Sequence, residues 1–89
     1  MKVTEKNIVY PAVLYRDPET GGFTIAIHDL GIVTEGETVE KAYLNCKEYL
    51  TTMCECAIRF DCEIEPPSNY IDICKKFKDN LVILVDTQV

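Results

Sequence analysis

The sequence predicts a single α+β domain over residues 1–89, with an antiparallel-rich sheet of about four strands packed on one long and one short helix. Three observations lead to this class. Short β-branched and aromatic stretches, separated by turns that contain Gly and Pro, fill the first part of the chain. A long stretch with apolar residues at helical spacing follows, and a run of consecutive apolar residues lies near the end. The expected order is therefore βββααβ.

The first two strands are expected at residues 8–15 and 23–30. Both are rich in β-branched, aromatic or apolar residues, and the second alternates between apolar and more polar side chains. Pro11 cannot donate to a ladder, so the first strand is either a sheet edge or has its free side at that point. The intervening RDPETGG contains the Asp-Pro and Gly-Gly pairs that hairpin connections favour. The polar-leaning face of the second strand predicts a sheet packed on one side only.

A short third strand is expected at residues 32–38, followed by a long helix. Thr38 is a good N-cap, and apolar residues then recur at helical spacing for about twenty residues. We interpret this stripe as facing the core rather than a cofactor. It comprises Val39, Ala42, Tyr43, Cys46, Leu50, Met53, Ala57 and Phe60.

The last part of the chain is expected to form a loop, a short helix and a buried strand. Residues 61–69 contain adjacent prolines and break the long helix. Asn69 is suited to cap a short helix over residues 70–77. The consecutive apolar residues within 81–87 predict a strand buried on both faces, near the middle of the sheet. Both helices are expected on one face of that sheet.

The charge balance favours a basic partner. Fifteen acidic and nine basic residues give a formal net charge of −6, which repels a phosphate backbone and argues against nucleic-acid binding by this chain alone. Opposite charge would instead speed encounter with a basic protein. No apolar run approaches the length of a membrane span, and the N-terminal residues lack the apolar stretch of a secretory signal. We therefore expect a cytoplasmic protein without membrane contact.

The five cysteines are an odd number and make a poor disulfide framework. Reduced thiols are expected for a cytoplasmic protein. Their spacing lacks paired C-x2-C motifs and the sequence has one histidine, so we interpret them as small buried residues rather than zinc ligands. Neither a metal nor a cofactor is predicted. The cysteines are Cys46, Cys54, Cys56, Cys62 and Cys74.

The histidine, His28, is followed by Asp29, a pair that could act as base and orienting carboxylate. Neighbours in a strand point to opposite faces, however, and no Ser or Cys nucleophile is visibly paired with them, so we expect a turn. Acids near strand ends could bind a divalent metal for hydrolysis, but the pattern does not show which of them converge. An antiparallel sheet with an exposed edge favours a binding module over an enzyme.

Residues 10–50 resemble the HicB family, the antitoxins of HicA–HicB toxin–antitoxin pairs. The motifs Y-P-A, G-G-F and D-L occur in the family's order. The most specific part of the match is T-E-G-E-T followed by a helix that opens with E-K-A, over residues 34–42. The IEPPSNY segment after the long helix also resembles the family. Two features depart from it: His28 stands where the family has proline, and Gly31 follows Leu30 without the second proline.

The resemblance implies a partial RNase H-like domain that binds HicA, a small basic RNA-cleaving toxin, and covers its catalytic histidine or RNA-binding face. Many family members continue into a DNA-binding domain; since this sequence stops at Val89, operator binding is not carried over. An exposed strand edge beside the apolar LVILV stretch favours a homodimer. A regulatory or ligand-binding module of the same fold and, further off, a metal-dependent nuclease stay open as alternatives. The candidate toxin-binding residues are Asp17, Glu19, His28, Asp29, Glu35 and Glu37.

Overall fold

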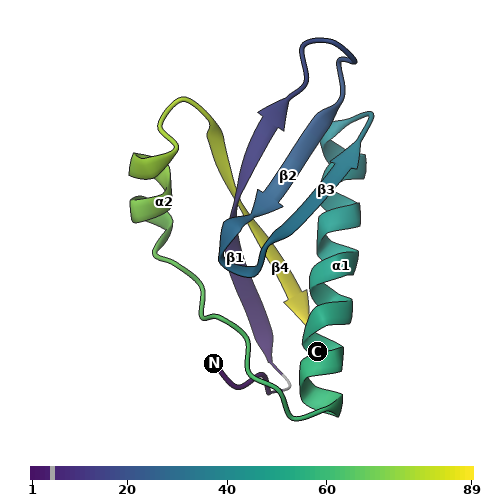
Figure 1. The fold of residues 1–89 in the computed structure, drawn as a ribbon, viewed down its shortest axis with the longest axis vertical. Coiled ribbons are helices and arrows are strands. Elements are labelled where there is room, and N and C mark those ends of the chain that lie inside the picture. The colour runs from purple at the N-terminus through teal and green to yellow at the C-terminus, as the bar shows by residue number, and fades with distance from the viewer. Residues whose placement is uncertain (5) are drawn as a thin grey trace.

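The expected strands and helices are present in the computed structural model, which describes residues 1–4 and 6–89 (Figure 1). The predicted α+β class and βββααβ order are confirmed. The second strand is shorter than expected, because a 3-10 turn begins at His28. Neither helix of the described chain offers an apolar stretch of membrane-spanning length. The elements are β1 (Asn7–Arg16), β2 (Phe23–Ile27), β3 (Ile32–Gly36), α1 (Val39–Arg59), α2 (Tyr70–Lys76) and β4 (Leu81–Gln88).

The four strands form one antiparallel sheet in the order β3-β2-β1-β4. Two positions were predicted for β1 from Pro11: a sheet edge, or an inner strand with a free side at Pro11. The edge position is wrong, because β1 lies between β2 and β4. The second position is correct, because β2 pairs only with residues 13–16 of β1, and Pro11 pairs with Leu84 of β4 on the other side. The central position expected for the last strand is also wrong. β4 is an edge strand, and Leu81 and Leu84 are 62% and 50% exposed.

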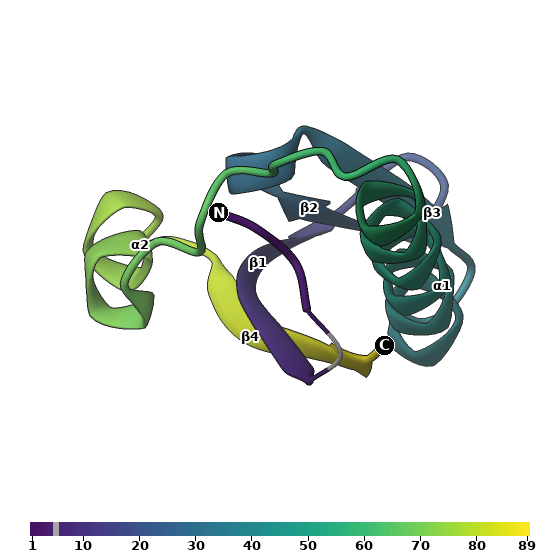
Figure 2. The same ribbon diagram turned by 90° about the horizontal axis from the view of Figure 1, so that it is seen from below.

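The main core lies between α1 and one face of the sheet (Figure 2). Alternate residues of the strands point into it, because successive side chains of a strand face opposite sides. Tyr10 of β1, Ile27 of β2 and Leu50 of α1 have no exposed surface there. Burying one large apolar side chain stabilises a fold by roughly 1.5–3 kcal/mol, so this layer makes the larger contribution to stability.

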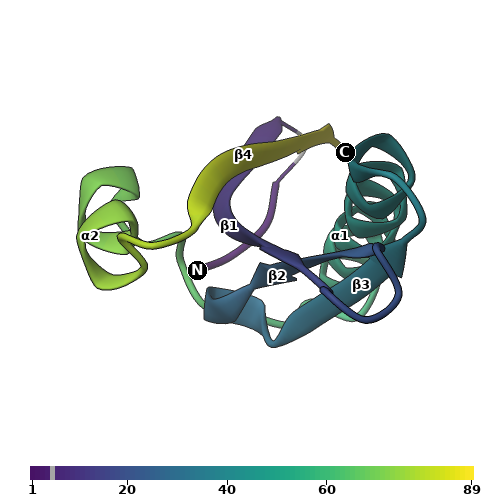
Figure 3. The ribbon, with the colours of Figure 1, turned by 90° about the horizontal axis from the view of Figure 1, so that it is seen from above.

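α2 packs against the opposite face of the sheet, so the expectations that both helices share one face and that the other face is unpacked are wrong (Figures 2 and 3). Val13 of β1 and Val82 of β4 point away from the main core and form a second cluster with Ile73 of α2. The ring of Phe77, directly after α2, stacks on the ring of His28 with 4.7 Å between centroids. The apolar run of β4 therefore has a different cause from the expected one: its two faces contact two different helices.

α1 begins at the predicted cap, where the Thr38 hydroxyl accepts a hydrogen bond from the Lys41 N–H at 3.1 Å. The centre of the predicted stripe is buried, but Val39 and Phe60 at its two ends are 39% and 67% exposed. The physical reason is length. A helix of 21 residues extends about 31 Å, whereas the neighbouring five-residue strands extend about 17 Å.

The segment between the helices, residues 61–69, is hydrogen-bonded to β1 and to the 3-10 turn after β2. The Tyr10 hydroxyl donates to the main-chain carbonyl of Glu65. Ser68 donates to the Asp29 carboxylate through its main-chain N–H, at 2.9 Å, and through its hydroxyl. Burial raises the pKa of Tyr10 to about 12, because a buried phenolate would lose its solvation.

Candidate functional site

Two connections meet at one end of the sheet: the β1–β2 hairpin and the β3–α1 junction. Asp17 opens the hairpin, where its carboxylate accepts a hydrogen bond from the Glu19 N–H at 2.9 Å. This hydrogen bond lowers the pKa of Asp17 below its ordinary value of 3.8. Glu35 pairs with Thr24 of β2, and Glu37 directly follows β3. Four of the six candidate residues therefore lie on these two connections.

Three of the acids, Asp17, Glu35 and Glu37, line one depression with a volume of about 490 Å³. Glu19 is exposed on the same hairpin loop. A recess with carboxylates around it suits the long side chains of Lys and Arg, whose charged ends pair with carboxylates. Asp17, Glu35 and Glu37 are therefore acids that converge on one site. The other lining residues are Thr20, Gly22, Phe23, Thr24 and Gly36.

The β3–α1 junction that carries two of these acids is tightly built. The Thr34 hydroxyl donates to the main-chain carbonyl of Ala42 in α1 at 3.1 Å. Gly36 approaches α1 so closely that an added Cβ would lie 2.4 Å from the Ala42 nitrogen. Alternate residues of T-E-G-E-T therefore hold the junction, while the two glutamates between them are exposed. The motif on which the family resemblance is most specific has a structural role here.

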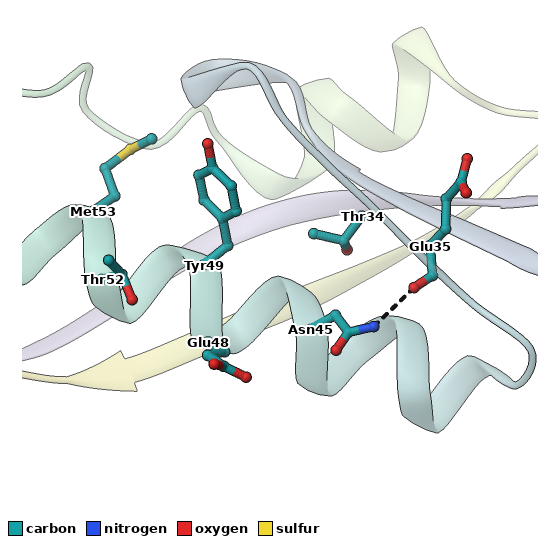
Figure 4. Close-up of a pocket in the computed structure, with 7 residues that line it drawn as sticks. All are labelled: Thr34, Glu35, Asn45, Glu48, Tyr49, Thr52 and Met53. Atoms are coloured by element: carbon teal, nitrogen blue, oxygen red, sulfur yellow. Dashed lines mark hydrogen bonds between the residues drawn. The ribbon is translucent and has the colours of Figure 1, made fainter.

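A second recess, of about 650 Å³, lies between β3 and α1 and shares Glu35 with the first (Figure 4). We call it the β3–α1 groove. Tyr49, which is 54% exposed, and the half-buried Met53 supply apolar surface, and Glu48 adds a carboxylate. The Asn45 side chain donates to the main-chain carbonyl of Glu35 at 2.9 Å. The lining residues are Thr34, Glu35, Asn45, Glu48, Tyr49, Thr52 and Met53.

Sequence reasoning missed the groove. Met53 packs against the main core, as predicted, but it also lines the groove, and no role was predicted for Tyr49. One signal was present: Tyr49 lies outside the buried stripe of an amphipathic helix, where an exposed aromatic side chain can mark a contact surface. The helical pattern could not show that β3 runs beside this flank of α1.

We call the surface around the two recesses the acidic face. It carries the recess acids Asp17, Glu35, Glu37 and Glu48, and Glu19 on the adjoining hairpin loop. Within the part of the chain that the structure describes, Glu37 alone among these five lies within 4.0 Å of a basic side chain, Lys41 at 3.6 Å. That pair is exposed, and exposed pairs of this kind contribute little to stability. The acidic face therefore presents negative charge to solvent.

His28 and Asp29 lie at the other end of β2. The His28 Nε2 atom is 2.9 Å from the Tyr15 hydroxyl, and the ring stacks on Phe77. The Asp29 carboxylate accepts hydrogen bonds from Ser68. Because the two side chains have different partners, they do not form the histidine–carboxylate hydrogen bond of a catalytic pair. The prediction of a turn at this position is confirmed by the 3-10 turn.

Among residues 1–4 and 6–89, no three His, Cys, Asp or Glu side chains are grouped to hold a metal ion. The five cysteines are free thiols. The prediction that they are buried is correct for Cys46 and Cys54, where burial raises the pKa of each thiol. It is wrong for Cys56 and Cys62, which are exposed, and Cys74 is half-buried.

Two solved structures that are similar to this chain come from toxin–antitoxin systems. The chain is similar to the antitoxin HicB of Burkholderia pseudomallei, with a TM-score of 0.75 and 20% identity, over 88% of this chain and 61% of that chain. It is also similar to a chain of a toxin–antitoxin complex from Streptococcus pneumoniae, with a TM-score of 0.74 and 21% identity, over 91% of this chain and 69% of that chain. No protein-family model and no curated protein matches the sequence.

The protein therefore has the fold of the HicB antitoxins, as the resemblance implied. It spans 61% of the length of the Burkholderia pseudomallei protein.

Proposed function

We propose that this protein is an antitoxin-type binding protein. It neutralises a small, basic, HicA-like mRNA-cleaving toxin in the cytoplasm and performs no chemistry of its own. The observation that carries the proposal is the acidic face, where acids from the hairpin and the β3–α1 junction converge on a chain with the HicB antitoxin fold.

Neutralisation on this proposal is by occlusion. A protein that cleaves RNA presents positive charge to the phosphate backbone, and a chain with a net charge of −6 and exposed carboxylates competes for that charge. Complementary potentials speed association and discriminate against like-charged partners. RNA cannot reach a covered active site or RNA-binding face, so cleavage stops although no covalent bond in the toxin changes.

The proposed contact has two regions. The four acids of the hairpin and the β3–α1 junction form the first. His28 and Asp29 form the second, at the other end of a strand of five residues, about 17 Å away. The internal hydrogen bonds of His28 and Asp29 limit what they can offer a partner, so the first region is expected to carry the larger share of the affinity.

The test uses the full chain and a recombinant HicA-like toxin. Glu35→Lys with Glu37→Lys reverses two charges on the acidic face. Glu55→Lys with Asp79→Lys changes the net charge equally at exposed positions outside it. We expect the first pair to weaken toxin binding about 100-fold and to restore RNA cleavage, and the second pair to change binding less than about threefold.

Equal losses from the two pairs would mean that net charge alone matters, and would remove the acidic face from the proposal. If the unchanged protein neither bound nor inhibited HicA-like toxins, the antitoxin function would be wrong. The regulatory or ligand-binding alternative would then stand.

We further propose that the protein is a homodimer formed through β4. An edge strand presents unpaired main-chain groups, and pairing of two copies about a twofold axis would satisfy them on both chains. The same pairing would cover Leu81 and Leu84, which are exposed in one chain. Light scattering is expected to give twice the 10.1 kDa mass of the chain, and a monomer mass at high concentration would disprove the dimer.

A further inference from the structure

The β3–α1 groove differs in chemistry from the acidic depression beside it. Tyr49 and Met53, four residues apart on α1, point to the same side of the helix (Figure 4). They give the groove an apolar surface, and Glu35 and Glu48 add carboxylates to its lining. Tyrosine and methionine are enriched in protein interfaces because they offer apolar contact area with an adaptable or polar end.

The groove runs beside α1. Its α1 residues run from Asn45 to Met53, which corresponds to about 12 Å along a helix axis. An extended peptide covers that distance with about four residues. The volume of about 650 Å³ would hold the side chains of such a segment.

Strand addition to β3 is not the favoured way to fill the groove. The main-chain carbonyl of Glu35 already accepts a hydrogen bond from Asn45, and the Thr34 hydroxyl is bound to α1. A partner segment would have to compete with Asn45 for the main-chain carbonyl of Glu35. Recognition here therefore depends on side chains.

We propose that the groove seats an extended segment of a basic partner protein. One apolar side chain of that segment packs against Tyr49 and Met53, and Lys or Arg side chains of the same segment face the two glutamates of the groove. Charge complementarity selects this occupant, because neither Glu35 nor Glu48 has a basic side chain within 4.0 Å in the described part of the chain. That the partner is a toxin rests on the proposed function; the chemistry of the segment does not.

The first experiment titrates the 15N-labelled full chain with the peptide N-acetyl-Arg-Leu-Arg-amide. The largest amide shifts are expected at Asn45, Glu48 and Tyr49. N-acetyl-Arg-Gly-Arg-amide should bind about fivefold more weakly, because the apolar contact is lost. N-acetyl-Glu-Leu-Glu-amide should cause no comparable shifts. Shifts that lie outside the groove, or equal binding of the basic and acidic peptides, would overturn the proposal.

The second experiment compares matched variants with the same peptide. Tyr49→Ala is expected to weaken binding about tenfold, while Leu44→Ala, at a position 52% exposed on the same helix and outside the groove, should not change it. Glu48→Lys should weaken binding about tenfold relative to Glu55→Lys, an equal change of charge elsewhere on α1. Thermal unfolding verifies that each variant is folded, and Tyr49→Ser replaces Tyr49→Ala if the latter is not. Equal effects within either pair would overturn the proposal.

Failure of this proposal is distinguishable from failure of the proposed function. If the protein inhibits a HicA-like toxin but Tyr49→Ala and Glu48→Lys leave toxin and peptide binding unchanged, the proposed role of the groove is wrong and the antitoxin function stands. If the peptide shifts the amide signals of the groove residues and no HicA-like toxin binds, the antitoxin function is wrong and the proposed role of the groove stands.

Discussion

The two edges of the sheet are built differently. Beside β3, α1 supplies hydrogen bonds to the edge: Asn45 donates to the Glu35 carbonyl, and the α1 main chain accepts from the Thr34 hydroxyl. β4 has the reverse character. Its residues are uncharged up to Asp86, and Leu84 is 50% exposed.

The difference gives one small sheet two edges of different chemistry. An edge strand with unpaired main-chain groups is a template for another strand. At β3 a helix limits that pairing, and the charges of the acidic face are held at a tight junction. At β4 an apolar surface and an open edge remain. The first edge suits a partner of opposite charge, and the second suits a copy of the same chain.

The largest expected effect on stability is at the β3–α1 junction, beside the β3 edge of the sheet. Gly36→Ala should lower the free energy of unfolding by about 2–3 kcal/mol, because the added Cβ would lie 2.4 Å from the Ala42 nitrogen. Gly21→Ala is the control: its φ is 73° and the space around it is open, so only the left-handed conformation costs free energy, about 1 kcal/mol. Urea unfolding measures both. Equal losses would show that the junction is not tight.

Tyr10 lies in β1, an inner strand of the sheet, so its substitution tests a position between the two edges. Tyr10→Phe removes the hydrogen bond to Glu65 and should lower the free energy of unfolding by about 1 kcal/mol at pH 7. The pKa of Tyr10 rises from 10.0 to about 12 on folding, so its contribution is complete below pH 10. It is lost as pH rises from about 10 to 12, because the unfolded chain releases the proton first.

Urea titrations between pH 8 and pH 11.5 would check this pH dependence. The loss of stability above about pH 10 should be smaller in Tyr10→Phe than in the unchanged protein. Identical slopes would mean that other groups cause the alkaline loss.

A smaller effect on stability is expected from removing one hydrogen bond at the β3 edge. Asn45→Ala should lower the free energy of unfolding by about 0.5–1 kcal/mol, because the Glu35 carbonyl would exchange a protein donor for water. Thr52→Ala, in the same groove, is the control and should change it by less. Urea unfolding distinguishes them. No difference would show that Asn45 does not support β3.

The smallest effect on stability is expected at the β4 edge. Leu84→Lys should change the free energy of unfolding of the monomer by less than about 0.5 kcal/mol, yet it should abolish the proposed homodimer. Val33→Lys, at a position 63% exposed on β3, is the counterpart and should leave the dimer intact. Light scattering measures both. Dissociation by Val33→Lys instead would place the dimer contact on the other edge.

Much of the local structure could be predicted from the sequence. Thr38 and Asn69 cap the helices as expected, and the strands and turns follow β-branched stretches and Gly-containing connections. The wrong predictions concern neighbours. An apolar run such as residues 81–85 indicates that a strand is packed against other elements, but it does not show whether those elements are strands or helices.

The candidate site shows the same limit. The pattern identified the acids near the turns, and no pattern identified Tyr49. Charge and turn chemistry are properties of single residues and short segments, so they can be recognised along the chain. Convergence on one recess depends on the pairing of β2 with β3 and on the position of α1 beside them.

Local patterns in the sequence specify the element types, their order and the helix caps, because these depend on interactions between residues close together in the chain, and the residue counts fix the net charge. Only the tertiary fold places Asp17 and Glu35 on one depression, packs α2 against the second face of the sheet, and opens a groove beside Tyr49. Those features join residues far apart in the chain. Strand order and helix position, which no local pattern specifies, bring them together.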